Sequence, residues 1–171
     1  MNVDESIIAY AVYEDSVEYS GTAKVALPDI TYLTQGFTGV GVAGNMEAVI
    51  AGYIDVMKMT LEFRTMNENS IALSEPRLHK ISLLASVQIE DTSSGTIAFQ
   101  SHKHVMVGIP TKYSGGSLAP ASIGTPTVEF AVRYWAFYID GVRMREIDPF
   151  NHIHFVNGRD YLADVRKALG K

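Results

Sequence analysis

Two pairs of histidines have the spacing that most clearly suggests chemistry. His102 and His104 lie two residues apart in a segment rich in β-forming residues, and His152 and His154 repeat this spacing. Because alternate side chains of a strand point to one face, each pair could offer two imidazoles to a metal ion. A zinc or iron site also needs a third ligand and groups that orient the ligands. Two interpretations stay open: a small β-sandwich metal-binding protein or enzyme with a His-x-His site, or polar residues on exposed strand faces.

Paired carboxylates and a glycine run are weaker candidates. Glu90 and Asp91 adjoin a turn signal, where acidic residues are ordinary surface groups, and Glu146 and Asp148 form a second pair that would matter only in a cleft. Residues 39–44 have the spacing of a dinucleotide fingerprint, but no alternation of buried strands and helices surrounds them. With no nucleophile elbow and no phosphate-binding lysine loop in the sequence, we expect no cofactor, no resident metal and no catalytic residue.

The composition excludes several classes of protein. The chain has 171 residues, of which 47% are hydrophobic and only 19% charged, with a formal net charge of -5 and no cysteine. We expect a single domain over residues 1–171, without disulfides or thiolate metal sites, and without the clustered basic residues of a nucleic-acid clamp. Neither a secretory signal nor an apolar run of membrane-spanning length is found in the sequence, so we expect a soluble subunit with no membrane partner.

One apolar stretch stands apart from the rest of the chain. Residues 36–52 contain five glycines, many aliphatic side chains and a single charge, Glu47. A loop on a monomer is usually polar, so an apolar loop of this length favours a surface that a partner covers. The residues expected to contact another subunit are Gly36, Phe37, Gly39, Val40, Gly41, Val42, Gly44, Met46, Val49, Ile50 and Gly52.

The elements around this stretch are mostly short alternating segments. Period-two hydrophobicity and turn residues predict strands at residues 7–13, 17–27, 30–37, 53–66, 80–91, 96–109, 128–139, 142–147 and 151–156. Short helices are expected after Ser74, with Pro76 in the first turn, and over residues 160–169, and a mobile loop over residues 110–127. The expected fold is therefore mainly β, an antiparallel sandwich or barrel with one or two short peripheral helices and extended loops for ring assembly.

Two groups of short motifs suggest a family. The chain resembles the major tail tube proteins of contractile-tailed bacteriophages and R-type bacteriocins, the FII-like family, at residues 21–25, 27–28 and 39–44 near one end and at residues 133–135, 139–141, 146–148 and 156–158 near the other. The resemblance covers about half of the chain, and the middle part matches only in the order of its elements.

The resemblance implies a structural, non-enzymatic subunit. Such subunits form hexameric rings that stack into the inner tube of a contractile tail or injection particle, assembled in the host cytoplasm. The implied partners are further copies of this chain, the tail sheath protein, the baseplate or tube initiator and the tape-measure protein, with DNA or an effector in transit through the channel.

Two hypotheses join the composition to this assembly. A charge placed at Val42 or Ile50 is predicted to leave a folded monomer that makes no tubes. The net acidity of the chain suggests a repulsive lumen that lets a polyanion slide, for which the candidate lining residues are Glu62, Glu68, Glu90 and Glu129.

Overall fold

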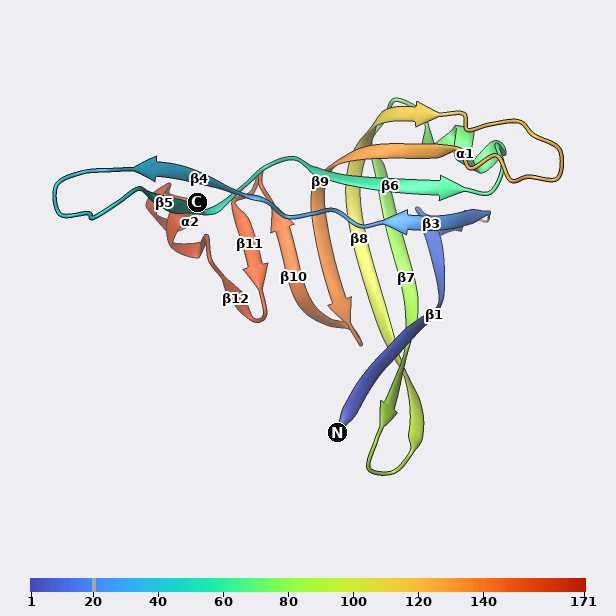
Figure 1. Ribbon diagram of the computed structural model, residues 1–171, viewed down its shortest axis with the longest axis horizontal. Coiled ribbons are helices and arrows are strands. Elements are labelled where there is room, and N and C mark those ends of the chain that lie inside the picture. The colour runs from blue at the N-terminus through green and yellow to red at the C-terminus, as the bar shows by residue number, and fades with distance from the viewer. Residues whose placement is uncertain (20) are drawn as a thin grey trace.

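The computed structural model describes residues 1–19 and 21–171, and this part of the chain forms twelve strands and two short helices (Figure 1). In chain order the elements are β1 (Asn2–Glu14), β2 (Val17–Glu18), β3 (Thr22–Ala26), β4 (Tyr32–Phe37), β5 (Met46–Ile54), β6 (Met57–Phe63), α1 (Glu68–Leu73), β7 (His79–Asp91), β8 (Thr96–Ser114), β9 (Thr127–Ile139), β10 (Val142–Asp148), β11 (Ile153–Val156), β12 (Arg159–Asp160) and α2 (Ala163–Ala168).

Strand β9 organises the main sheet. Along one edge it pairs with β8, and its other edge is shared, with β6 beside its first half and β10 beside its second half. All the strand pairs are antiparallel, and the ladder continues from β8 through β7 to β1 and β2, and from β10 through β11 to β12. Because β9 has three partners, the sheet folds over itself and encloses a core, which confirms the expected antiparallel β architecture.

The core lies where β6 and β9 face strands β1, β7 and β8. Strand β6 alternates strictly, with Met57, Met59, Leu61 and Phe63 fully buried, as its period-two pattern predicts. The side chains that these four meet come from six other elements: Val12, Leu73, Ile81, Leu83, Met106, Val128, Phe130, Val132, Trp135 and Ile147. Full burial of each large apolar side chain contributes about 1.5–3 kcal/mol, so this cluster is the main source of the fold's stability.

A buried polar network crosses the edge of this core. The carboxylate of Glu14 accepts hydrogen bonds from Tyr19 Oη at 2.8 Å and Arg77 Nη1 at 2.8 Å, and lies 2.6 Å from His79 Nδ1. Burial alone would raise the pKa of Glu14, but the hydrogen bonds from Arg77, Tyr19 and His79 outweigh it and lower the pKa below its usual range. The network ties the end of β1 to the connection between α1 and β7.

The first helix ends just before the residue at which the sequence pattern places its start. The expected start at Ser74 is wrong: Ser74 follows the last helical residue of α1 and is its C-terminal cap. The helix begins after Asn67, whose side-chain oxygen accepts from the backbone N–H of Ser70 at 2.9 Å, while the Ser70 hydroxyl accepts from the Asn67 N–H. This reciprocal pair satisfies two N–H groups that the helix leaves free, and burial of Leu73 then fixes the helix on the core.

Three other boundaries also differ from expectation. Strand β8 does not stop at residue 109 but continues through Pro110 to Ser114, because a register shift between Pro110 and Lys112 lets a residue without an N–H sit in the ladder. The segment expected as one strand over residues 17–27 forms β2 and β3, which pair with different partners. Helix α2 covers only Ala163–Ala168, and none of its residues is buried.

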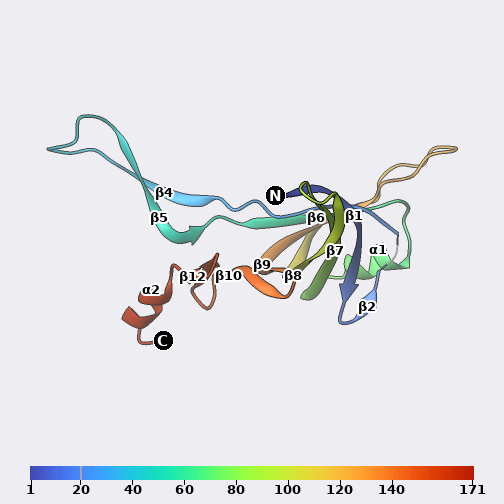
Figure 2. The same ribbon diagram turned by 90° about the horizontal axis from the view of Figure 1, so that it is seen from below.

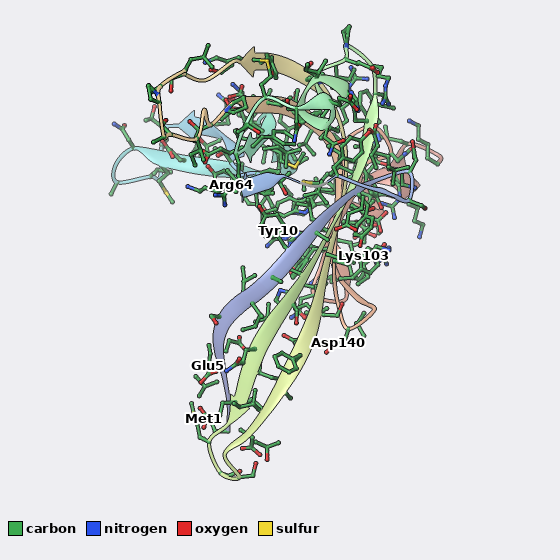
Figure 3. The ribbon with its side chains drawn as sticks, turned by 90° about the vertical axis from the view of Figure 1, so that its right-hand side faces the viewer. Met1, Glu5, Tyr10, Arg64, Lys103 and Asp140 are labelled. Atoms are coloured by element: carbon green, nitrogen blue, oxygen red, sulfur yellow. The ribbon has the colours of Figure 1, made fainter. Side chains whose placement is uncertain are left out.

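Two segments project from the body, which is the folded part around the core. The β4–β5 hairpin, residues 32–54, is called the arm; Figure 2 shows it leaving the body on the side of α2 and β12. Residues 2–6, 88–91 and 96–99 are called the extension, and Figure 3 shows it with Met1 at its far end and Glu5 partway along. The two projections differ in one respect, since the strands of the extension continue the main sheet whereas the arm is a separate two-stranded sheet.

Candidate functional site

The apolar segment that the sequence singles out is a hairpin rather than a loop. Residues 36–37 end β4, residues 46–52 belong to β5, and only residues 38–45 form an irregular tip. Phe37 pairs with Met46 and Thr34 with Val49 across the hairpin. The loop expected over residues 36–52 is therefore wrong in its secondary structure, because cross-strand pairing satisfies the backbone polar groups that a glycine-rich segment would otherwise leave to water.

The arm offers an apolar surface with almost no charge. None of its side chains is buried, and Glu47 is its one charged residue. The large exposed hydrophobic residues of the arm are Tyr32, Leu33, Phe37, Val40, Met46, Val49, Ile50 and Tyr53. Isolated two-stranded hairpins are only marginally stable in water, so the arm combines a weak local structure with a surface that binding to a partner would stabilise.

The contacts at the root of the arm come from the end of the chain. Tyr32 Oη lies 2.9 Å from His154 Nε2, and the two rings meet edge to face with their centroids 5.5 Å apart. On the other strand of the arm, Gly52 lies directly against Leu162, the residue before α2. Both contacts join residues more than 100 positions apart, and the sequence contains no local signal for either.

The histidines do not assemble a metal centre. His102 and His104 share a face of β8, as predicted, but His104 stacks on Phe137 with centroids 4.4 Å apart and accepts from Trp135 Nε1 at 3.2 Å. His152 precedes β11 in a turn with φ of +52°, so it and His154 are not a strand pair as expected. In the described part of the chain, no three histidine or acidic side chains come together where they could hold a metal ion.

Two of these histidines resist protonation. Burial lowers the pKa of His104 to about 4, with a smaller contribution from the neighbouring His102. The pKa of His154 is also lowered, first by burial and then by the charge of Arg145, although Asp160 acts in the opposite direction. The neutral state of these rings fits packing and hydrogen bonding within the fold, and this geometry does not favour the metal-site interpretation.

The four acids proposed for a channel lining lie in three places. Glu62 on β6 and Glu129 on β9 lie on neighbouring strands, on the face turned away from the core. Glu68 is in the first turn of α1, and Glu90 is in the extension. Around the first pair are three lysines: Lys58 Nζ is 3.3 Å from Glu129, Lys112 lies opposite Glu129, and Lys24 opposite Glu62. This face is therefore mixed in charge.

One further apolar surface has no signal in the sequence. Ile7 and Ile8 at the base of the extension, and Ile97 and Phe99 within it, are all more than half exposed. The strand pattern gave no warning, because Ile97 and Phe99 alternate like core residues and only the position of the extension beyond the body exposes them. The extension thus adds apolar surface to that of the arm.

The described residues thus form a β body that carries two apolar projections. Comparison with known proteins identifies the family of the chain. The chain belongs to the family of the phage tail tube protein FII, whose sequence model matches residues 4–170. By this family membership it is a phage tail tube protein.

Individual relatives agree with this assignment. The chain is similar to the tail tube protein of Escherichia phage P2, with 26% identity over 164 residues that cover 93% of each chain. Two solved structures share the fold, both from an extracellular contractile injection system, PVC, in the extended state. One, from its sheath/tube terminator, has a TM-score of 0.54 and 15% identity and covers 78% of this chain and 96% of that chain. The other, from its sheath-tube complex, has a TM-score of 0.50 and 16% identity and covers 75% of this chain and 87% of that chain.

One further observation concerns membranes. Among the described helices, neither α1 nor α2 has the length and hydrophobicity that a membrane-spanning helix requires.

Proposed function

We propose that this tail tube protein closes into hexameric rings and that the arm carries the contact between copies, either within a ring or between stacked rings. The observation that supports the proposal is the arm itself, a 32–54 hairpin with eight large exposed hydrophobic side chains and one charge. A free monomer that displays such a surface risks aggregation, whereas a copy that covers it gains about 25 cal/mol for each Å² of apolar area buried.

The contact residues of the arm are those that the sequence singled out. The glycines Gly36, Gly39, Gly41, Gly44 and Gly52 shape the hairpin and its tip, and the side chains that would touch a neighbour are Phe37, Val40, Val42, Met46, Val49 and Ile50. Val42 is only half-buried at the tip, where its N–H donates to the carbonyl of Gly39 at 3.2 Å. We propose a second copy as the partner because the arm carries one charge, so two arms would not repel each other strongly.

The other partners follow from the same assembly. We propose that the outside of the tube meets the sheath protein, that its ends meet the baseplate or tube initiator, and that a tape-measure protein and then DNA or an effector occupy the channel. The similarity to a chain of a sheath-tube complex supports the arrangement. In this role the subunit binds and guides but performs no catalysis.

The channel lining remains a separate proposal. Glu62 and Glu129, which share one exposed face, are the pair we assign to the lumen before Glu68 and Glu90. Their three lysine neighbours outnumber the two carboxylates, so this pair lowers the affinity of the face for a polyanion but does not make the face acidic. Glu62→Lys together with Glu129→Lys is expected to make assembled tubes retain single-stranded DNA in a sedimentation assay at low salt; unchanged retention would argue against this lining.

The assembly proposal is tested by a charge on the arm. Val42→Asp and Ile50→Asp are each expected to leave a soluble folded subunit that forms no rings or tubes, because burying an unpaired carboxylate costs several kcal/mol. The matched controls are Val42→Thr and Ile50→Thr, which keep a β-branched side chain without a full charge and should still assemble. Negative-stain electron microscopy and size-exclusion chromatography give the readout, and normal tubes from both aspartate variants would refute the role of the arm.

A further inference from the structure

We propose that the last part of the chain, from β11 to α2, is a clamp that fixes the direction of the arm, and that His154 and Leu162 are its positioning residues. The consequence for assembly rests on the proposed function of the arm, but the clamp itself is a property of a single subunit. Figure 1 shows α2 and β11 beside the root of the arm, at the end of the molecule opposite α1.

The arm needs such a clamp because no backbone ladder joins it to the body. Strands β4 and β5 pair only with each other. The chain enters and leaves the arm through short connections, and the backbone hydrogen bond from Asp55 N–H to the carbonyl of Thr31, 2.8 Å long, closes its base. Ile30 and Ile54 at this base pack against the core. Beyond this point the direction of the hairpin is not determined by any strand of the main sheet.

The root of the arm is also irregular. Tyr32 pairs with Ile54, but the next pair is Thr34 with Val49, so residues 50–53 lie opposite Leu33 alone. A bulge interrupts the ladder and bends the strand that carries it. The arm therefore has a site of easy bending at its base, and its direction depends on whatever side chains hold that site.

The first point of the clamp is Leu162 against Gly52. Gly52 has φ of +67°, and a Cβ atom placed on it would lie 2.6 Å from Leu162 Cγ and Cδ2. Only glycine accepts both this backbone conformation and this close approach. Leu162 is 7% exposed, whereas Leu169 at the end of α2 is 55% exposed, so the burial of Leu162 comes from its place beside the arm and not from a buried helix face.

The second point is His154 against Tyr32, on the opposite strand of the arm. His154 is 3% exposed, its Nε2 lies 2.9 Å from Tyr32 Oη, and its ring meets the Tyr32 ring edge to face. A cleft of about 540 Å³ lies beside the Leu162–Gly52 contact, with Tyr53 of the arm and Phe150 of the C-terminal segment among the residues that line it. His154 and Leu162 thus hold the two strands of the arm from the same C-terminal segment.

The clamp is itself rigidly built around Asp160. One carboxylate oxygen accepts hydrogen bonds from the backbone N–H of Leu162 at 3.0 Å and from that of His154 at 3.3 Å. A single carboxylate therefore holds the backbone of both positioning residues. The other oxygen pairs with Arg166 Nη2 at 2.6 Å, and Arg166 Nη1 donates to the carbonyl of His152 at 2.6 Å. Burial raises the pKa of Asp160, but the bonds from Arg166, Leu162 and His154 outweigh it and lower the pKa, so the carboxylate stays ionised at neutral pH.

A fixed arm binds a partner at lower entropic cost than a swinging one. If the arm samples many directions, the population that points at a neighbouring copy falls, and the apparent affinity falls by the same fraction. The clamp therefore acts on assembly without touching the neighbour, which distinguishes His154 and Leu162 from the contact residues of the arm.

The experiment measures the direction of the arm in the free subunit. The chain has no cysteine, so Thr38→Cys at the tip of the arm and Lys80→Cys on β7 give a unique pair of spin labels. Double electron–electron resonance on dilute subunits reports the distribution of distances between the two spin labels. We expect a narrow distribution in the parent protein, and one at least twice as wide in Leu162→Ala and in Tyr32→Phe.

The matched control is Leu169→Ala, which makes the same change in the same segment at an exposed position and should leave the distribution narrow. Tyr32→Phe removes only a hydroxyl, so it reports on the clamp even if Leu162→Ala alters the stability of the C-terminal segment. An unchanged width in both Leu162→Ala and Tyr32→Phe would overturn the proposal. Failure here would leave the role of the arm in assembly intact, and normal tubes from the arm aspartate variants would leave the clamp intact.

Discussion

The body buries its large apolar side chains, whereas the arm exposes side chains of the same types. In the body, Phe130 is 0% exposed among methionines and aliphatic side chains from several strands, whereas Phe37 in the arm is 45% exposed and packs against no core residue. Both segments form β-strands, and both are rich in apolar residues. The difference lies in the surroundings of the strands. Strand β9 pairs along both of its edges and one of its faces is covered by the core, whereas β4 and β5 pair only with each other and no second layer covers them.

This contrast explains how the subunit can be stable alone while it carries the surface that we propose for assembly. The buried core lies in the body, so the apolar surface of the arm can be exposed without loss of that core. A glycine-rich, nearly uncharged hairpin would be a poor stabilising element, yet it can adapt to a neighbour because little of its own structure depends on its side chains.

Truncating one phenylalanine in each region should give the largest contrast. Phe130→Ala removes a fully buried ring from the centre of β9 and is expected to cost about 4 kcal/mol of unfolding free energy. Phe37→Ala in the arm should change the stability of the free subunit by less than about 0.5 kcal/mol. Urea denaturation of dilute subunits measures both values, and a cost above 2 kcal/mol for Phe37→Ala would show that the arm packs on its own body.

Removing one acidic charge from each region should have the next largest effect. Glu14→Gln takes a charge from the network with His79 and Arg77 and is expected to destabilise the body by about 2–3 kcal/mol, because the remaining partners lose their buried counter-charge. Glu47→Gln is the matched change in the arm, where the carboxylate is exposed and no destabilisation is expected. Thermal melting checks both, and equal melting temperatures would contradict the structural role of the Glu14 network.

Acid should weaken the body through its histidines, to a smaller extent. The folded-state pKa of His104 is about 4, below its ordinary value of 6.5. Between these two pH values the unfolded chain binds a proton that the folded chain does not, so stability falls as the pH decreases from about 6.5 to about 4. The expected loss is about 2 kcal/mol after allowance for partial exposure of the ring.

Denaturation of the parent protein and of His104→Phe at several pH values isolates this contribution. The variant should show a flatter profile over the same range, with the remaining slope in part from His154, whose pKa is lowered in the same direction. The arm contains no histidine, so none of this dependence should come from it. Identical slopes in the two proteins would exclude His104 as a source.

Amide exchange should reveal the smallest difference, between the arm and the extension. The extension is three-stranded and continuous with β1, β7 and β8 of the body, so its opening must disrupt the main sheet. The arm can open without disturbing any other ladder. In hydrogen exchange followed by mass spectrometry on free subunits, peptides from residues 46–54 should therefore exchange several-fold faster than those from residues 86–91. Equal rates would mean that the arm is held more firmly than its ladder indicates.

Local patterns in the sequence predicted most of the fold. The alternation around Met57 to Phe63, the Asp140-Gly141 turn and the pattern from Ile81 to Ile89 each identified a strand, because side-chain period and turn chemistry are properties of neighbouring residues. The strand content and the antiparallel class followed from them. The errors occurred where a local signal had a competitor, as with Ser74, which resembles a helix start but lies beyond a helix that Asn67 had already capped.

The candidate site was predicted in part. The apolar stretch of residues 36–52 was recognised because its composition is unusual for a loop, but its hairpin structure was not, since four glycines precede β5 and β5 itself has no regular polar–apolar alternation. The histidine pairs gave a pattern consistent with a metal site, and the structure instead stacked His104 on Phe137 and bonded His154 to Tyr32. The same spacing serves either purpose, and only the surrounding residues distinguish the two.

The sequence by itself determined most of the strands, that the chain carries surplus apolar surface, and one stretch that carries it, because these depend on composition and on residues close together in the chain. The tertiary structure alone decided that Tyr32 meets His154, that Gly52 meets Leu162, and that Ile97 and Phe99 lie beyond the body. These relations join residues far apart in the sequence, and they depend on the path of β9, whose three partners fold the sheet over and leave the arm outside it.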